Sequence, residues 1–509
     1  HLIFEASGIK KGDKIAICGR NSSHWGVTFL ATLTYGAVAV PILHEFKADN
    51  IHNIVNHSEA KLLFVGDQEW ENLNEAAMTI LEGIILMTDF SILISRTEKL
   101  DYAREHLNEL FGKKYPKNFR KEHIEYHKDQ PEELAVINYT SGTTSYSKGV
   151  MLPYRSLWSN TAFAFEVLPL KAGDKIISML PMAHMYGLAF EFLYEFSAGC
   201  QIYFLTRMPS PKIIFQAFSE VKPHLVVAVP LIIEKIIKKN VLPKLETPTM
   251  KLLLKVPIIN DKIKTTVREG VVSAFGGRFA EVIVGGAAFN QEVEQFLRMI
   301  EFPYTVGYGM TECGPLISYA PWDEFVLGSS GKILDIMEAR IYKETPEAET
   351  GEIQVRGENV MVGYYKNQEA TQEVFTQDGW LRTGSMDSNG NIFIRGRLKT
   401  MILSSSGQNI FPEELETKLN NLPFILESLV IERNKKLVAL VYADYEALDS
   451  LGLNNPDNLK TIMDENLKNL NSNVAAYEKI SKIQLYPTEF EKTPKRSIKR
   501  YLYNSIAVD

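Results

Sequence analysis

A short stretch of hydroxyl side chains, glycine and lysine occupies residues 140–149, which read TSGTTSYSKG. It follows an apolar, β-branched run at residues 134–139 that predicts a buried strand. Backbone N–H groups and Ser and Thr hydroxyls can donate hydrogen bonds to phosphate oxygens, and Lys148 adds a positive charge. The stretch therefore indicates phosphate binding, while its composition alone is equally typical of a surface turn.

The positions beside Lys148 argue against the commonest phosphate-binding loop. A P-loop has glycine directly before its lysine and serine or threonine directly after it. In this chain Ser147 precedes the lysine and Gly149 follows it. We therefore expect a nucleotide-binding loop of a different kind.

The whole stretch resembles the signature loop of the adenylate-forming superfamily, which includes acyl-CoA synthetases, adenylation domains of peptide synthetases and luciferases. The family loop reads TSGTTG and then PKG, so Ser145 replaces a glycine and Ser147 a proline. The resemblance implies an enzyme that holds the phosphates of ATP in this loop. The residues that it assigns to the loop are Thr140, Ser141, Gly142, Thr143, Thr144 and Lys148.

Residues 306–312, VGYGMTE, match a second motif of the family without departure. By this resemblance Tyr308 stacks on adenine, Thr311 donates to the α-phosphate, and Glu312 is an oxygen ligand of the Mg²⁺ that accompanies ATP. A glycine-flanked buried strand end would leave the acidic residue unexplained. The nucleotide contacts that we expect in this motif are Gly307, Tyr308, Gly309, Met310 and Thr311.

Two further motifs are less specific. Residues 180–187, LPMAHMYG, resemble the segment that borders the acyl pocket in the family, which implies that His184 lies beside the acyl carbonyl. The alternative is a histidine buried in the hydrophobic core, which is what a lone histidine in an apolar run usually is. Residues 284–288 predict a strand end that opens into a helix, where missing side chains let a flat ring or a phosphate approach the backbone. The resemblance places adenine and the acyl chain along Gly285, Gly286, Ala287 and Ala288, and a tight turn is the alternative.

The last third of the chain matches the family with departures. The resemblance implies that Arg397 contacts the ribose, that Lys399 is the hinge between two domains, and that Lys495 assists adenylation. Ser385 stands where the family places a ribose-binding aspartate, and Ser497 stands at the strict position of the terminal lysine. At each position we expect either that the family residue is truly lost or that residues are missing from this sequence. For the aspartate, the missing residues would lie after Gly384.

Together the motifs imply an AMP-forming acid–thiol ligase, most similar to long-chain fatty acyl-CoA synthetases. Such an enzyme uses ATP and Mg²⁺ to activate a fatty acid as an acyl-AMP and then transfers the acyl group to coenzyme A. The catalytic residues implied are Lys148, His184, Thr311, Glu312 and Lys495. Three alternatives remain: a ligase that delivers to an acyl carrier protein, a synthetase for a medium-chain or aryl acid, and a nucleotide- or acyl-binding pseudoenzyme.

The elements that must position these residues alternate between strands and helices, which predicts an α/β fold. The clearest helix begins after Asn290, a favourable N-cap, and has apolar residues at helical spacing. After about residue 399, strands at 429–431 and 437–442 precede an amphipathic helix, which predicts a small α+β unit. With the resemblance, we expect a large multi-subdomain N-terminal domain of mixed sheets flanked by helices at 1–397, and a small mobile C-terminal domain at 398–509. The other predicted strands are 14–18, 62–65, 134–139, 176–180, 224–229 and 281–284.

Bulk properties exclude several classes of protein. The chain has 509 residues, 45% of them hydrophobic, and its net charge of -7 gives no positive surface for a nucleic acid. Three scattered cysteines suit neither a disulfide framework nor a zinc site. The few cysteines fit a reducing cytoplasm, where we expect the protein. No apolar run reaches the roughly 18 residues of a membrane span, so we expect a soluble protein, with peripheral membrane contact left open. Because residue 1 is His1 and not methionine, we also expect the natural chain to begin earlier.

Overall fold

The computed structural model describes residues 1–140, 147–207, 210–245, 257–343, 351–388, 391–396, 400, 402–403, 409–434, 436–492 and 498–503. The chain divides into two compact units, and each is described by itself. The larger unit comprises His1–Thr140, Ser147–Ala339 and Val355–Leu381. The smaller unit includes the described residues of Arg340–Gln354 and Arg382–Asp509. The predicted domain boundary at 397/398 lies outside the described residues and stays a prediction.

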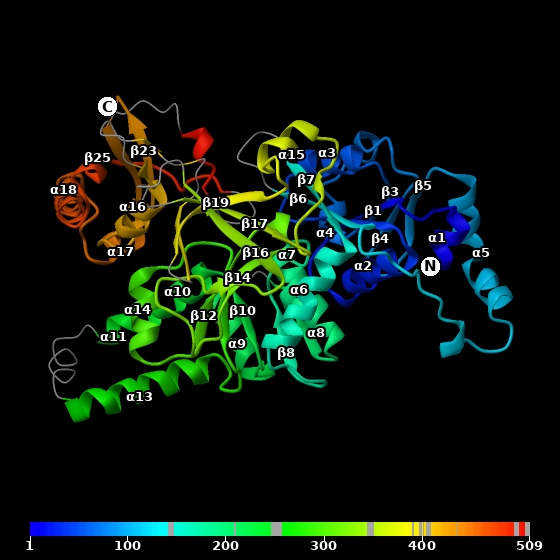
Figure 1. The fold of residues 1–509 in the computed structure, drawn as a ribbon, viewed down its shortest axis with the longest axis horizontal. Helices are drawn as coiled ribbons and strands as arrows, with labels where there is room; N and C mark the ends of the chain where they lie inside the picture. Colours follow the sequence, from blue (N-terminus) through cyan, green and yellow to red (C-terminus); the bar gives the residue numbers. More distant parts are fainter. Residues whose placement is uncertain are drawn as a thin grey trace. The chain divides into compact units, whose positions relative to one another are not determined.

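An eight-stranded sheet forms the first half of the larger unit (Figure 1). Its central strands pair in parallel and are almost completely buried, as the continuous apolar runs of β1 and β2 require. Strands β7 and β18 extend one edge in the antiparallel sense. In spatial order the strands are β18 (Gly363–Tyr364), β7 (Lys148–Pro153), β6 (Leu134–Thr140), β2 (Val38–Ile42), β1 (Lys14–Cys18), β3 (Ala60–Val65), β4 (Gly83–Leu86) and β5 (Ile92–Ser95). Helices of this part are α1 (Leu2–Ser7), α2 (Ser23–Tyr35), α3 (Ala48–Ser58), α4 (Asp67–Trp70), α5 (Glu98–Lys114), α6 (Tyr154–Val167) and α15 (Gln368–Val374).

A second part of the larger unit is built on the parallel sheet β10-β11-β12, with strands Val226–Ala228, Val282–Val284 and Tyr304–Val306. Its core contains Phe218, Phe275 and Phe302, packed together with the apolar faces of the surrounding helices. Those helices are α9 (Pro211–Val221), α10 (Pro230–Asn240), α11 (Leu242–Leu245), α13 (Pro257–Ala274) and α14 (Gln291–Met299).

Shorter elements join the two parts. A parallel pair, β8 (Lys175–Ser178) and β9 (Gln201–Phe204), flanks a helical run made of α7 (Met185–Leu188), the π-helical turn η3 (Ala189–Leu193) and α8 (Tyr194–Ser197). A three-stranded sheet follows β12 and consists of β13 (Tyr308–Gly309), β14 (Leu316–Tyr319) and β15 (Lys332–Ile333), with the 3-10 turn η4 (Thr311–Cys313) between the first two.

The C-terminal region has its own core. Strands β23 (Ile425–Arg433), β24 (Lys436–Ala443) and β25 (Ile480–Leu485) form a sheet whose apolar side packs with Leu415 and Met463 of two helices. These helices are α16 (Pro412–Leu419) and α18 (Pro456–Ser472), and α17 (Tyr445–Ser450) lies between them in the sequence. Another sheet has the order β16 (Met337–Tyr342), β17 (Gly351–Gly357), β19 (Leu381–Ser388) and β20 (Ile392–Gly396), and a short pair is β21 (Ile402–Leu403) with β22 (Asn409–Ile410).

The predicted α/β class of mixed sheets flanked by helices is confirmed. Helix α14 begins as predicted, because the Oδ1 atom of Asn290 accepts hydrogen bonds from the backbone N–H groups of Glu292 and Val293, at 3.1 and 3.2 Å. The predicted strand 176–180 ends early, at Ser178. Within the described part of the chain, no helix is long and apolar enough to cross a membrane.

Candidate active site

Lys148 and Glu312, which the sequence predicts at one triphosphate, meet through a single tyrosine. Lys148 begins β7 opposite Thr140 of β6, and its Nζ atom lies 4.9 Å from the centre of the Tyr364 ring. The hydroxyl of Tyr364 donates a hydrogen bond of 2.8 Å to the Oε1 atom of Glu312. The cation, the ring and the carboxylate therefore form one continuous group of side chains.

Main-chain pairing fixes this arrangement. Tyr364 pairs with Val150 across β18 and β7, and the next N–H, of Tyr365, donates to the carbonyl oxygen of Gly149 at 2.7 Å. The N–H of Met361 donates to the main-chain oxygen of Glu312 at 2.8 Å. One segment of chain is thus bonded both to the strand that carries Lys148 and to the turn that carries Glu312.

The turn around Glu312 is held by two buried asparagines. Asn160 of α6 donates to the carbonyl oxygen of Cys313 and accepts from the N–H of Leu316, both at 3.1 Å. Asn359 donates to the carbonyl oxygen of Leu316 at 2.6 Å. Neither asparagine has measurable exposure, so these contacts satisfy backbone groups that would otherwise be buried without partners.

Glycine is required beside this turn. A Cβ atom on Gly309 would lie 2.3 Å from the carbonyl oxygen of Pro315, which accepts the N–H of Met310 at 2.8 Å. The close approach of the two chains leaves Tyr308, Met310 and Glu312 half-buried and Thr311 buried.

The segment before His184 is irregular backbone whose polar groups bond to buried side chains. Glu191 of η3 accepts the N–H groups of Met179 and Leu180, at 2.9 and 2.7 Å. This carboxyl group takes the two N–H groups that would continue strand β8, which explains why the strand ends at Ser178. The carbonyl oxygen of Ala183 accepts from Asn138 of β6 at 2.8 Å, so the segment is tied to the strand that leads to Thr140.

Asn21 completes this support with two bonds. Its Nδ2 atom donates to the carbonyl oxygen of Leu180 at 2.6 Å, and its Oδ1 atom accepts from the N–H of Met182 at 2.9 Å. His184 itself caps α7, where its Nδ1 atom accepts the N–H of Tyr186 at 3.2 Å. That bond places the proton of a neutral imidazole on Nε2.

Tyr186 connects the histidine segment to the glycines after β11. Its hydroxyl donates to the carbonyl oxygen of Ile283 at 3.1 Å, and a Cβ atom on Gly285 would lie 3.1 Å from the tyrosine ring. Gly286 has φ 88, and its position faces open space apart from Val229. Gly286, Ala287 and Ala288 are exposed and form part of an irregular segment that precedes α14, so the predicted strand end does not open directly into the helix.

The structure thus brings the predicted residues Thr140 and Lys148 together with the 307–312 motif. His184 and the 285–288 segment are connected to them through hydrogen bonds of neighbouring residues, those of Ala183 with Asn138 and of Tyr186 with Ile283. The other predicted positions lie outside the described residues: Ser141, Gly142, Thr143, Thr144, Arg397, Lys399 and Lys495. Ser385 is described only as a residue of β19 opposite Gly396. The predicted roles of all these residues stay predictions.

The residues present suit a magnesium ion that arrives with ATP. Glu312 offers one half-buried carboxylate, and the described residues contain no group of three or more side chains that could hold a metal by themselves. Mg²⁺ is commonly bound by one or two carboxylates while substrate phosphates and waters complete its shell. Exposed Gly286, with no side chain, similarly leaves room for a flat ring against the backbone.

Burial keeps Tyr364 a hydrogen-bond donor. Its side chain is buried, and this burial, followed by the negative charge of Glu312, raises the pKa of its phenol well above the ordinary value. The hydroxyl therefore stays protonated at neutral pH, and its bond to the carboxylate is retained.

Tyr364 is not among the residues predicted from the sequence, although it contacts both Lys148 and Glu312. Also not predicted were Asn21, Asn138, Asn160 and Glu191. Buried polar side chains nearly always have hydrogen-bond partners, but a polar residue within an apolar run does not reveal which distant backbone groups it will meet.

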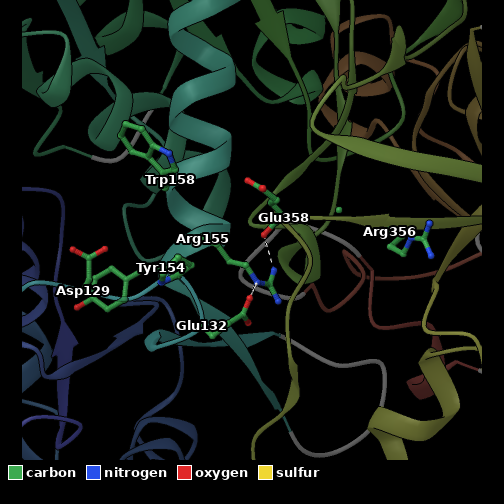
Figure 2. A pocket seen from close by; sticks show the side chains of 9 residues that line it. Asp129, Glu132, Tyr154, Arg155, Trp158, Arg356 and Glu358 are labelled. Carbon is green, nitrogen blue, oxygen red and sulfur yellow. Dashed lines mark hydrogen bonds and ion pairs between the residues drawn. The ribbon is translucent and has the colours of Figure 1, made fainter.

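A separate surface hollow of about 550 Å³ contains none of the predicted site residues. Figure 2 shows that Arg155 of α6 lies at this hollow, between the carboxylate of Glu132 and the main chain at Glu358. Arg155 also donates to the carbonyl oxygen of Val360 at 2.7 Å. Its contribution to the site is indirect, since it holds the segment that leads into Tyr364.

Comparison with known proteins supports the same interpretation. The chain is 30% identical to long-chain-fatty-acid–CoA ligase 5 of Rattus norvegicus, over 86% of this chain and 68% of that protein. It is 26% identical to the long-chain-fatty-acid–[acyl-carrier-protein] ligase AEE15, chloroplastic, of Arabidopsis thaliana, over 85% of this chain and 69% of that protein.

Among solved structures, ATP-bound MatB from Rhodopseudomonas palustris has the same fold, with a TM-score of 0.75 and 21% identity, over 99% of this chain and 90% of that one. The family model described as AMP-binding enzyme matches residues 2–365, which include both predicted nucleotide motifs. The chain therefore belongs to the family of AMP-binding enzymes.

Proposed function

We propose that this chain activates a fatty acid with ATP as an acyl-adenylate and then transfers the acyl group to the thiol of coenzyme A. The observation that carries the proposal is the contact of Tyr364 with both Lys148 and Glu312. Through this tyrosine, a cation and a carboxylate from segments far apart in the sequence lie close together. A magnesium nucleotide needs both kinds of group, the cation for its phosphates and the carboxylate for its metal.

In the first half-reaction, a carboxylate oxygen of the fatty acid attacks the α-phosphorus, a P–O bond forms, and pyrophosphate leaves. Negative charge builds on the phosphoryl oxygens in the transition state. We assign its stabilisation to the ammonium of Lys148 and the hydroxyl of Thr311, acting as preorganised donors. Glu312 would hold the Mg²⁺, which supplies further neutralisation of phosphate charge when it is bound.

In the second half-reaction, the thiol of coenzyme A attacks the acyl carbonyl, the thiol proton is released, and AMP leaves. We assign His184 to the acyl side, where the three polar supports of its segment fix its position. We assign the wall for adenine to the irregular segment at 285–288 and to residues 307–311, which include the short strand β13. Arg397 would contact the ribose and Lys495 would assist adenylation, as the resemblance to the family implies.

The nature of the acyl acceptor has one specific competitor. A relative named as an acyl-carrier-protein ligase matches 85% of this chain, and the CoA ligase of Rattus norvegicus matches 86% of it. A carrier protein is therefore the second candidate acceptor. We further propose a cytoplasmic location, which the composition of the chain and its scattered free cysteines support.

Exchange of labelled pyrophosphate into ATP tests the first half-reaction. We expect exchange only when a fatty acid is present, and its absence over a series of chain lengths would refute enzyme function and favour a pseudoenzyme. Release of AMP tests the acceptor. Release that requires coenzyme A supports the proposal, whereas release that requires an acyl carrier protein and not coenzyme A supports the competitor.

A further inference from the structure

We propose that Tyr364 is a positioning residue that couples the phosphate-binding cation to the metal-binding carboxylate. Its hydroxyl orients Glu312 for the metal, and its ring holds Lys148 next to the place where the phosphates bind. The inference deepens the proposed function and rests on it for the identity of the ligands. The geometry from which it is drawn is independent of the reaction.

The backbone of Tyr364 is fixed on both sides. Its N–H donates to the Oγ1 atom of Thr371 in α15 at 2.9 Å, and it pairs with Val150 of β7. Gly363, before it, has φ 146, and a Cβ atom there would lie 2.8 Å from the side chain of Thr371. Little freedom is left to this residue, so the ring and the hydroxyl have defined positions.

The segment before the tyrosine is fixed by α6. The guanidinium of Arg155 donates to the carbonyl oxygen of Glu358 at 2.6 Å (Figure 2). It also donates to the carbonyl oxygen of Val360 at 2.7 Å. Ser156 donates to the same oxygen of Val360 at 3.3 Å. Because α6 also carries Asn160, one helix holds both the tyrosine segment and the Glu312 turn.

The bond to Glu312 leaves the carboxylate able to bind a cation. An ionised carboxylate has about four lone-pair sites, and the Tyr364 hydroxyl takes one of them. It restricts rotation of the group and directs the remaining lone pairs. Residues that orient a metal ligand in this way are those whose loss weakens metal binding, without their touching the metal.

The adjacent residue offers a matched control. Tyr365 also donates its hydroxyl to a carboxylate, that of Glu59 at 2.9 Å, and the Nζ atom of Lys366 lies 5.2 Å from its ring centre. Glu59 is exposed and has no part in the proposed site. Tyr365→Phe therefore removes a similar hydrogen bond next to Tyr364 without touching Glu312.

The test compares Tyr364→Phe with Tyr365→Phe in two measurements on the full chain. The first is Mn²⁺ affinity in the presence of ATP, followed by electron paramagnetic resonance, which does not require catalysis. We expect Tyr364→Phe to weaken it about tenfold, the lower end of typical losses for residues that support a metal ligand. We expect Tyr365→Phe to leave it within about twofold, since it removes a similar bond elsewhere.

The second measurement is the pyrophosphate exchange rate as a function of Mg²⁺ concentration. Tyr364→Phe should raise the half-saturating Mg²⁺ concentration and leave the KM for fatty acid unchanged. Tyr364→Leu, which also removes the ring, should in addition raise the KM for ATP. Urea midpoints of the variants show whether each is folded.

The outcomes separate the two proposals. Equal Mn²⁺ affinity in Tyr364→Phe and Tyr365→Phe overturns the role of Tyr364, whatever the exchange rates are. A selective loss of Mn²⁺ affinity in Tyr364→Phe, together with no exchange in the wild type, supports that role and refutes the proposed reaction.

Discussion

Carboxyl groups of this protein occur in surroundings that differ in burial and in hydrogen bonding. Glu312 is half-buried and accepts a hydrogen bond from Tyr364. Burial raises the pKa of Glu195 to about 8 and that of Glu294 to about 7. A carboxyl that holds its proton near neutral pH is a poor ligand, because metal binding requires the ionised form.

Glu294 gives a pH-dependent prediction for stability. Its pKa is about 7 in the folded chain against an ordinary value of 4.5, because burial disfavours the ionised form. Between these values the folded state keeps a proton that the unfolded state has lost, so stability falls as pH rises, by at most about 1.4 kcal/mol per pH unit. Glu294→Gln does not titrate and keeps an oxygen that can accept the N–H of Gly328.

We therefore expect Glu294→Gln to gain stability relative to the wild type as pH rises from 5 to 8. Urea unfolding followed by tryptophan fluorescence measures this in the larger unit, which contains all five tryptophans. Glu292→Gln, at an exposed position of the same helix, is the control. A difference between Glu294→Gln and the wild type that is the same at every pH would contradict the assignment.

Helix α6 supports two separate parts of the proposed site. Its residues bond to the tyrosine segment through Arg155 and to the Glu312 turn through Asn160. Two loops that lie far from the helix in sequence thus share one rigid support. Such support allows catalytic groups on loops to keep a defined geometry.

Loss of Asn160 should destabilise this arrangement. Asn160→Ala leaves the carbonyl oxygen of Cys313 and the N–H of Leu316 buried without these partners, which costs about 2 to 5 kcal/mol in unfolding free energy. Exchange activity should fall as well. Thr161→Val, which removes only a bond within the same helix, should cost about 1 kcal/mol. Equal urea midpoints for the two variants would argue against a supporting role of Asn160.

The elements were more predictable from the sequence than the contacts between them. The strand before the predicted phosphate loop and the helix after Asn290 follow from local patterns, apolar runs and an N-cap, and both are confirmed. Asn160 and Cys313 are 153 residues apart, and Tyr364 and Glu312 are 52 apart. No local pattern specifies such pairs. The strand predicted at 176–180 was too long for the same reason, since Glu191 takes its last N–H groups.

At the scale of the whole molecule, the two proposed half-reactions differ in whether they require movement at the predicted hinge, Lys399. The resemblance to adenylate-forming enzymes implies a rotation about Lys399 between them. Proline fixes φ and removes an N–H, so we expect Lys399→Pro to spare pyrophosphate exchange and to lower transfer to coenzyme A by about tenfold or more, which corresponds to roughly 1.4 kcal/mol. Lys399→Ala, which keeps backbone freedom, should preserve both. Equal loss of exchange and transfer in Lys399→Pro would contradict a hinge.

The central claim is that Lys148 and Glu312 serve one bound nucleotide and its metal. A crystal structure of the full chain with Mn²⁺ and a non-hydrolysable ATP analogue tests it directly, because anomalous scattering locates the metal. We predict the manganese ion on the Glu312 carboxylate and on phosphate oxygens of the same nucleotide, with the ammonium of Lys148 in contact with its phosphates. A nucleotide bound elsewhere, with neither side chain touching it or its metal, would contradict the account.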